Sequence, residues 1–256
     1  MRPDVYKYAS RGVLPFACFP DKAETFNMNY LGDFISLIFP RICAACGNSL
    51  WKNETGLCRS CEYHLPKTNF HHSADNPVAR LFWGREDIVS AAAFLYFNKG
   101  SKVQRLVHQL KYKGRKDIGV CLGVLYGLEL KYSPNFNSAG CIIPVPLHKQ
   151  KFMKRGYNQS EQIAIGLSEA MHIPVSSHLL KRIKATETQT RKSRFSRYQN
   201  VKDIFLVDSP AQWKGQHLIL VDDVVTTGAT LESCIRALKA IPEVKISIAC
   251  LATAMI

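Results

Sequence analysis

The chain has 256 residues, 46% of them hydrophobic, which is enough for one or two globular domains. No apolar run approaches the roughly 18 to 20 residues that a membrane helix needs, and the first residues do not read as a secretory signal, so we expect a cytoplasmic protein without a membrane span. The net charge of +14 favours an anionic partner, either a polyphosphate ligand or a nucleic acid, over a basic surface that serves only solubility.

The first part of the chain divides into a leader and a cysteine-containing segment. Residues 1–27 mix proline, charge and aromatic residues without periodicity, so we expect a mobile or non-native leader, with Met28 as a candidate true start. Residues 28–66 are expected to form a short amphipathic helix followed by a metal-binding ribbon. Residues 67–89 carry Pro77, His71 and His72 together with Asn and Ser residues, and this composition predicts a linker.

Four cysteines form two Cys-x-x-Cys pairs, Cys43 with Cys46 and Cys58 with Cys61. Each pair can place two thiolates on one metal ion from a tight turn, and two pairs at this spacing are typical of a zinc ribbon. Four protein ligands leave no open position for water, so we expect a structural Zn²⁺ site. The alternative is two redox-active or unpaired thiol pairs.

Strand patterns and helix patterns alternate from residue 90 to residue 256. Strands are expected at Ser90–Phe97, Cys141–Leu147, Leu218–Val221 and Val244–Ala252, and helices at Val103–Tyr112, Ile118–Leu130, Ser160–Met171 and Leu231–Leu238. Alternation of this kind predicts an α/β domain with a parallel sheet and a ligand at the carboxyl ends of its strands.

The most informative stretch is LILVDDVVTTGATLESC, residues 218–234. An apolar strand is followed by two acids, Asp222 and Asp223, then by a turn of Thr and Gly residues and a helical pattern. This order aims backbone N–H groups and a helix N-terminus at an anion. The lysine of a Walker loop and the glycines of a dinucleotide loop are missing. The alternative is a strand that ends in two solvated aspartates capping a helix.

The stretch resembles the 5-phosphoribosyl-1-pyrophosphate (PRPP) motif of type I phosphoribosyltransferases. The resemblance implies a ribose diol held by Asp222 and Asp223, which would be the catalytic acids, a 5-phosphate held by the following turn, and Mg²⁺ bound with PRPP. The implied PRPP-binding residues are Val221, Asp222, Asp223, Val224, Thr226, Thr227, Gly228, Ala229 and Thr230.

Basic residues gather in two further stretches. Residues 99–116 contain no acid, and the turn Lys111–Arg115 is the part most expected at a site. Residues 181–202 are expected to form a long loop or lid that excludes water. Lysine and arginine with interleaved aromatics also suit single-stranded nucleic acid, and a solvated basic surface stays open as the plain alternative. The candidates for pyrophosphate or lid contacts are Lys113, Arg115, Pro146, Leu147, Arg155, Arg191 and Lys192.

The Asp222–Thr230 motif, the segments Pro144–Leu147 and Arg155–Gln159 and the four cysteines together resemble the ComF family, over roughly residues 30–254. These are phosphoribosyltransferase-like proteins linked to competence and DNA uptake in bacteria. The resemblance implies a type I phosphoribosyltransferase-like parallel sheet with a small N-terminal zinc ribbon. One departure is Thr190–Ser193, where relatives often carry smaller apolar residues.

Three functions follow as hypotheses: a transferase that releases pyrophosphate from PRPP to an unnamed acceptor, a PRPP sensor without catalysis, and a protein that handles single-stranded DNA or contacts DNA-uptake proteins. The sequence identifies no acceptor pocket.

Overall fold

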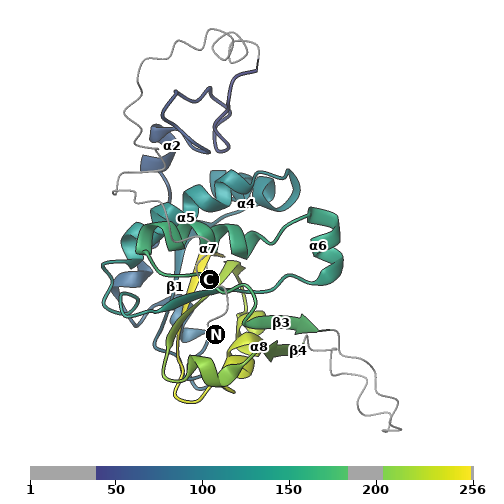
Figure 1. Cartoon of the computed structure of the whole chain (residues 1–256). Helices are drawn as coiled ribbons and strands as arrows, with labels where there is room; N and C mark the ends of the chain where they lie inside the picture. Colours follow the sequence, from purple (N-terminus) through teal and green to yellow (C-terminus); the bar gives the residue numbers. More distant parts are fainter. Residues whose placement is uncertain (1–38, 184–203, 255–256) are drawn as a thin grey trace, which may run out of the picture.

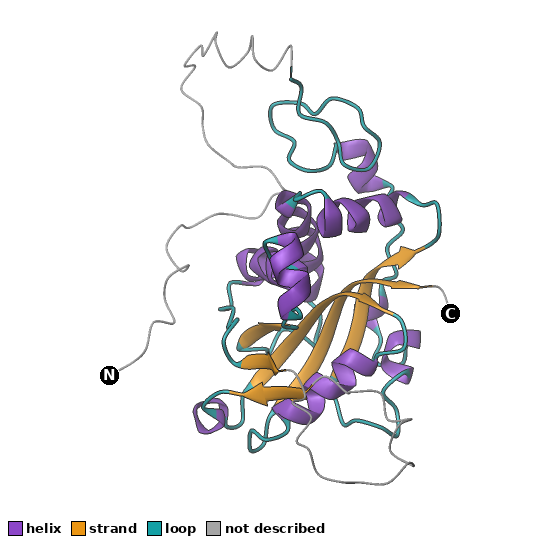
Figure 2. Cartoon of the chain, turned by 90° about the vertical axis from the view of Figure 1, so that its right-hand side faces the viewer, coloured by secondary structure: helices purple, strands orange, loops and turns teal. Residues whose placement is uncertain are grey.

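A parallel sheet of four strands forms the centre of the computed structural model, which describes residues 39–183 and 204–254 (Figure 2). The strand order across the sheet is β1-β6-β5-β2. These strands are β1 (Ser90–Phe97), β6 (Lys245–Ala254), β5 (His217–Val225) and β2 (Cys141–Pro144), and every neighbouring pair is parallel. The predicted α/β fold with a parallel sheet is therefore confirmed.

Helices cover both faces of this sheet (Figure 1). The helices α4 (Lys102–Tyr112), α5 (Lys116–Leu130) and α7 (Gln159–Met171) share one hydrophobic core, and α3 (Pro77–Arg80) and α8 (Ala229–Leu238) share the other. Strand β5 supplies both cores by alternation, since Ile219 and Val221 face the first core and Leu218 and Leu220 the second. A strand buried on both faces needs the unbroken apolar run that the sequence shows.

Two regions hold a helix or strands that we did not expect. Helix α6 (Lys149–Arg155) lies between β2 and α7, in a stretch for which we expected neither a helix nor a strand. Its sequence gave no apolar periodicity because none of its residues is buried, and local caps define it instead. The His148 ring accepts a hydrogen bond from the Gln150 N–H, and Gly156 ends the helix at φ +76°.

The second difference lies at the two ends of the expected lid, residues 181–202. Strands β3 (Leu180–Ile183) and β4 (Ile204–Val207) pair antiparallel, so the chain leaves and re-enters this region as two strands. Each strand has only four residues, and two of those in β3 are basic. The sequence therefore shows no recognisable strand alternation of apolar and polar residues here. The residues between these strands, including Arg191 and Lys192, lie outside the described part of the chain.

The segment before the sheet holds the short helices α2 (Arg59–Tyr63), η1 (Phe70–His72) and α3; a further short helix, η3 (Pro210–Trp213), precedes β5. Within residues 67–89, where we expected a linker, Val78 and Phe82 are buried in the second core, and Lys67 bridges to Leu95 of β1. The expected helix within residues 28–39 and the leader 1–27 lie outside the described residues, except Phe39. Within residues 39–183 and 204–254, no helix has the length and apolar character needed to cross a membrane.

Helices α5 and α7 pack through glycines. A Cβ atom added to Gly119 would lie 2.8 Å from the Gln162 Cβ, and one added to Gly127 would lie 2.7 Å from the Ala170 Cβ. A Cβ on Gly166 would collide with the Val120 carbonyl oxygen. The two backbones therefore lie closer than a side chain at these glycines would permit, and this close packing fixes the position of α7 relative to α5.

We predict that Gly166→Ala lowers the thermal midpoint by several degrees, because the added methyl group must push α7 away from α5 at a cost of about 1–3 kcal/mol. Calorimetry or circular dichroism at one protein concentration measures the midpoint. Glu169→Ala, on the exposed side of the same helix, is the control and should change the midpoint little. A Gly166→Ala midpoint equal to that of the control would contradict the close packing.

Candidate functional site

Two acids lie near the carboxyl end of β5, where three elements meet. The Asp222 Oδ1 atom accepts hydrogen bonds from the Ser160 hydroxyl at 3.0 Å and from the Asp223 backbone N–H at 2.8 Å. The Asp223 Oδ2 atom lies 3.0 Å from the Lys111 ammonium. Ser160 comes from the start of α7 and Lys111 from the last turn of α4. Each carboxylate therefore has its own polar partner from a different helix.

The two carboxylates differ in their surroundings. Burial raises the pKa of Asp222 to about 7, and the neighbouring negative charge of Asp223 adds to this rise. The Asp223 N–H and the Ser160 hydroxyl favour the ionised form and limit the increase. Asp222 is half-buried. With a pKa of about 7, its carboxyl group can donate a hydrogen bond when protonated or accept one when ionised near neutral pH.

The turn that follows the acids presents unpaired donors. Gly228 has φ +76° and is the N-cap of α8. A Cβ at Gly228 would lie 3.1 Å from the Phe82 ring, so the turn rests on an aromatic side chain from the segment before the sheet. The neighbouring residues Thr226, Thr227, Ala229 and Thr230 are exposed. Among the described residues, none accepts a hydrogen bond from the backbone N–H groups of residues 227–230. A helix N-terminus with free amides and hydroxyls suits a phosphate.

The loop after β2 lies beside the acids. The Val145 N–H donates to the Val221 carbonyl at 2.9 Å, and the Asn158 amide donates to the Val145 carbonyl at 2.9 Å. These bonds fix Pro146 and Leu147, both half-buried, at the carboxyl end of the neighbouring strand. Arg155 bonds to the Gln159 side-chain oxygen at 2.8 Å, at the start of α7.

Of the basic candidates near α4, the structure separates Lys113 from Arg115. Lys113 is exposed at the C-cap of α4, whereas Arg115 makes three hydrogen bonds to Asp117, so much of its charge is already neutralised. The residue that reaches the acids is Lys111, which lay in the expected turn but was not among the specific candidates. It follows Val107 by one helical turn, and this spacing was the signal that could have placed it on the inner side of α4.

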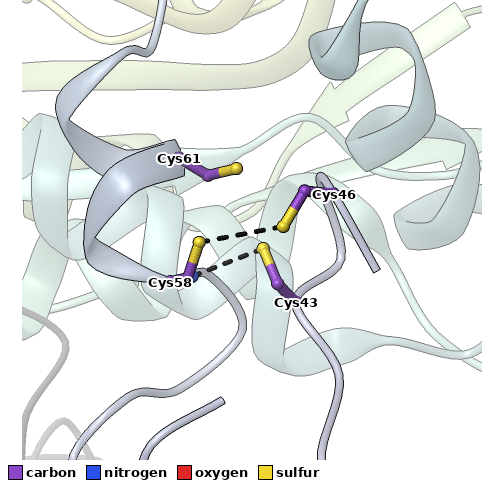
Figure 3. A group of neighbouring side chains, drawn as sticks. All are labelled: Cys43, Cys46, Cys58 and Cys61. Atoms are coloured by element: carbon purple, nitrogen blue, oxygen red, sulfur yellow. Dashed lines mark hydrogen bonds between the residues drawn. The ribbon is translucent and has the colours of Figure 1, made fainter. Parts of the chain in front are cut away.

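The four cysteines gather at one point (Figure 3). Their sulfur atoms all lie within 4.8 Å of one another, and the Sγ atoms of Cys46 and Cys58 are 3.8 Å apart. Zn–S bonds of about 2.3 Å at tetrahedral angles require sulfur atoms about 3.8 Å apart, so the four thiols fit a closed zinc site. The Cys58 N–H donates to the Cys43 sulfur at 3.3 Å, as is common for a thiolate ligand. The predicted cluster is confirmed, and zinc itself stays a prediction.

The sequence of this chain is similar to one domain family and to several bacterial proteins. Residues 156–256 match the model of the phosphoribosyl transferase domain. Competence protein F of Haemophilus influenzae is 39% identical over 213 residues, which cover 77% of this chain and 90% of that protein. DNA utilization protein YhgH of Escherichia coli O157:H7 is 33% identical over 74% of this chain and 80% of its own length. Competence protein ComFC of Bacillus subtilis is 33% identical over 77% of this chain and 78% of its own.

Among solved structures, a purine phosphoribosyltransferase from Pyrococcus horikoshii Ot3 is 22% identical, with a TM-score of 0.35, and the match covers 53% of this chain and 73% of that one. At that score the likeness carries no weight beside the domain match.

We predict that Asp222→Asn raises the thermal midpoint of the ligand-free protein. The increase should be larger at pH values above 7 than at pH 5.5. In the unfolded chain Asp222 ionises near its ordinary pKa of 3.8, but in the folded chain only near pH 7, so the folded state holds the extra proton between these values. The wild type therefore loses stability as pH rises toward 7, by up to about 2 kcal/mol from pH 5.5, and Asn removes this loss.

The measurement is the difference in midpoint between Asp222→Asn and wild type at several pH values from 5.5 to 8.5. The difference should grow up to about pH 7 and then level off. A difference in midpoint that does not change with pH would show that folding does not raise the pKa of Asp222. Asp223→Asn, which removes the partner of Lys111, serves as the comparison.

Proposed function

The chain belongs to the ComF family, and on this premise we propose that its α/β domain binds PRPP with Mg²⁺ at the carboxyl end of β5. One observation carries the proposal. Two acids held by Ser160 and Lys111 are followed, after the last two residues of β5, by an exposed turn whose N–H groups have no acceptor among the described residues. The two carboxylates are acceptors for a sugar diol, and the N–H groups of the turn are donors for a phosphate. The two sets of groups lie only a few residues apart in the chain.

The acids and the turn take different parts of the ligand. Asp222 and Asp223 bind the 2- and 3-hydroxyl groups of the ribose, and the amides and hydroxyls of Thr226–Thr230 bind the 5-phosphate. The positive end of the α8 dipole adds to this attraction. Val221 and Val224 are the strand positions that hold the acids in place, because β5 pairs with β6 along this stretch.

The pyrophosphate belongs on the side of the sheet where the loop after β2 and the end of α4 lie. Pro146 and Leu147 come from the loop, Arg155 from the end of α6 that follows it, and Lys113 from the C-cap of α4. Mg²⁺ takes oxygen ligands and usually keeps several waters, and the oxygen-rich surroundings of PRPP at this site fit that preference. When bound, it neutralises charge on the pyrophosphate.

Chemistry at this site would begin with loss of pyrophosphate from the anomeric carbon and attack by an acceptor. Positive charge develops on the sugar as the bond to pyrophosphate breaks, and the carboxylates of Asp222 and Asp223 stabilise it. A phosphoribosyltransferase releases pyrophosphate with a suitable acceptor, whereas a PRPP sensor binds without turnover. Pyrophosphate release in the presence of candidate acceptors distinguishes the two.

We expect calorimetric titration of the zinc-loaded protein with PRPP and Mg²⁺ to give saturable binding that Asp222→Ala/Asp223→Ala abolishes. The double variant removes both acceptors for the diol. Asp75→Ala/Asp208→Ala is the matched control, because it makes the same change in net charge at two exposed acids elsewhere. Equal affinity in the wild type and the Asp222→Ala/Asp223→Ala protein would refute the assignment of the site.

A second candidate function is handling of single-stranded DNA, in line with the competence and DNA utilization names of the relatives. The observation in its favour is an exposed aromatic and basic surface beside the proposed site. Tyr112 is 58% exposed, and the Arg155 guanidinium lies 5.2 Å from its ring centre. Phe152 and Met153 are exposed on α6 among its four basic residues. Bases stack on such rings while lysines hold the phosphates.

We predict that Tyr112→Ala weakens binding of a single-stranded oligonucleotide at every salt concentration, because stacking is lost. Lys113→Ala should instead reduce the slope of log affinity against log salt by about 0.7, the value for one phosphate contact. Fluorescence anisotropy from 50 to 300 mM salt measures both effects. Tyr132→Ala, at an exposed tyrosine away from this surface, is the control. Wild-type binding without salt dependence would count against a nucleic acid role.

A further inference from the structure

Helix α4 contacts the four-cysteine segment through two side chains. The Arg105 guanidinium donates to the Ala45 carbonyl at 2.7 Å, and the Gln109 side-chain amide donates to the Ala44 carbonyl at 2.6 Å. Ala44 and Ala45 lie between Cys43 and Cys46 and are buried, at 2% and 0% exposed. The turn that carries the first cysteine pair is therefore docked on the helix through its backbone.

The last turn of the same helix reaches the candidate site. Lys111, in the last turn, pairs with Asp223 at 3.0 Å, and the Leu110 carbonyl accepts a hydrogen bond from the Tyr157 hydroxyl. Residues of a helix rotate by about 100° each, so Lys111 points about 200° away from Gln109. One face of α4 thus contacts the cysteine turn, and nearly the opposite face contacts the sheet edge and the acids. Figure 1 shows α4 between the segment with α2 and the rest of the domain.

We propose that α4 couples the four-cysteine site to the acid pair: Lys111 is a binding residue of the PRPP site, and Arg105 and Gln109 are positioning residues that set its place on Asp223. The proposal rests on the proposed function for its ligand. It adds a cation that the motif does not contain, and it gives the cysteine site a role in ligand affinity beyond holding its own segment together.

The physical argument starts from the size of the cysteine segment. It has few apolar residues of its own, so a metal on Cys43, Cys46, Cys58 and Cys61 would provide most of its order. An ordered turn presents the Ala44 and Ala45 carbonyls at fixed points, and α4 is held against them by two hydrogen bonds. A further contact runs from the Lys102 ammonium to the Cys61 sulfur at 3.6 Å. Shifts of about 1 Å in a ligand-binding group are enough to change affinity.

Lys111 is well placed to act on the ligand. The Lys111 side chain is 22% exposed and the Asp223 side chain 14%, so the pair is largely shielded from screening by salt. In the ligand-free protein the ammonium offsets the charge of the second acid. When PRPP is bound, its ribose would lie on Asp223. The flexible Lys111 side chain could then reach the pyrophosphate with its ammonium group.

Hydrophobic packing is the competing explanation for the position of Lys111. Val103, Leu106, Val107 and Leu110 of α4 are all buried in the first core, and they can hold the helix without the cysteine turn. The two explanations differ in one consequence: only the proposed coupling makes Arg105 and Gln109 act on ligand affinity through Lys111.

A double-mutant cycle tests this consequence. PRPP affinity with Mg²⁺ is measured by calorimetry for wild type, Arg105→Ala/Gln109→Ala, Lys111→Ala and the triple variant, all with zinc content checked. We expect the Arg105/Gln109 change to weaken binding roughly three- to tenfold in wild type and less than twofold in the Lys111→Ala background. Arg105→Lys, which keeps a donor for Ala45, should stay near wild type. Gln104→Ala, on α4 but away from the cysteine turn, is the control.

Equal losses of affinity in both backgrounds, or no loss in wild type, would overturn the proposal. If the double variant does not fold, Arg105→Ala and Gln109→Ala are tested singly against the same expectation. A second readout needs no ligand, so it separates failure of the coupling from failure of the proposed function. The ¹³C resonance of the Asp223 carboxyl should shift in Lys111→Ala, and in the same direction in Arg105→Ala/Gln109→Ala and on removal of zinc by a chelator. An unchanged resonance in the last two would refute the coupling.

Discussion

Two adjacent carboxylates at the end of a buried strand are the constraint on which the rest of this structure depends. Placing Asp222 and Asp223 side by side is unfavourable, since burial and the neighbouring charge of Asp223 both raise the cost of ionising Asp222. The fold offsets this with a hydroxyl from α7 and an ammonium from α4. Helices from two parts of the chain must therefore meet at one strand end, and a parallel sheet with crossover helices brings them there.

Much of the fold could be read from the sequence because it depends on local pattern. Helix α4 shows a clear inner side and was predicted to within one residue of its observed bounds. The start of β5 was predicted equally well from its apolar run, but the strand continues to Val225, four residues beyond the expected end, and includes both acids. The four cysteines were found for a different reason: their spacing reflects the geometry of a metal ion and needs no knowledge of the surrounding fold.

The missed features all depend on tertiary contacts or on caps. Helix α6 buries no residue, and β3 with β4 forms a pair whose strands are separated by about twenty residues in sequence, so neither leaves an amphipathic pattern. Within the site, the acids and the turn were predicted from one continuous motif. Ser160 and Lys111 were not among the named candidates, because they reach Asp222 and Asp223 from helices distant in the sequence.

The contact between Gly228 and Phe82 has a consequence for how this chain can be divided. The phosphate-binding turn proposed here rests on an aromatic ring supplied by residues that precede the first strand. The Asn76 amide ties the same segment to Ala91 of β1 through a 2.8 Å hydrogen bond. A fragment that starts at Ser90 would keep every acid and threonine of the motif but would lack the Phe82 ring against which the turn packs. The smallest autonomous piece should therefore begin upstream of Asn76.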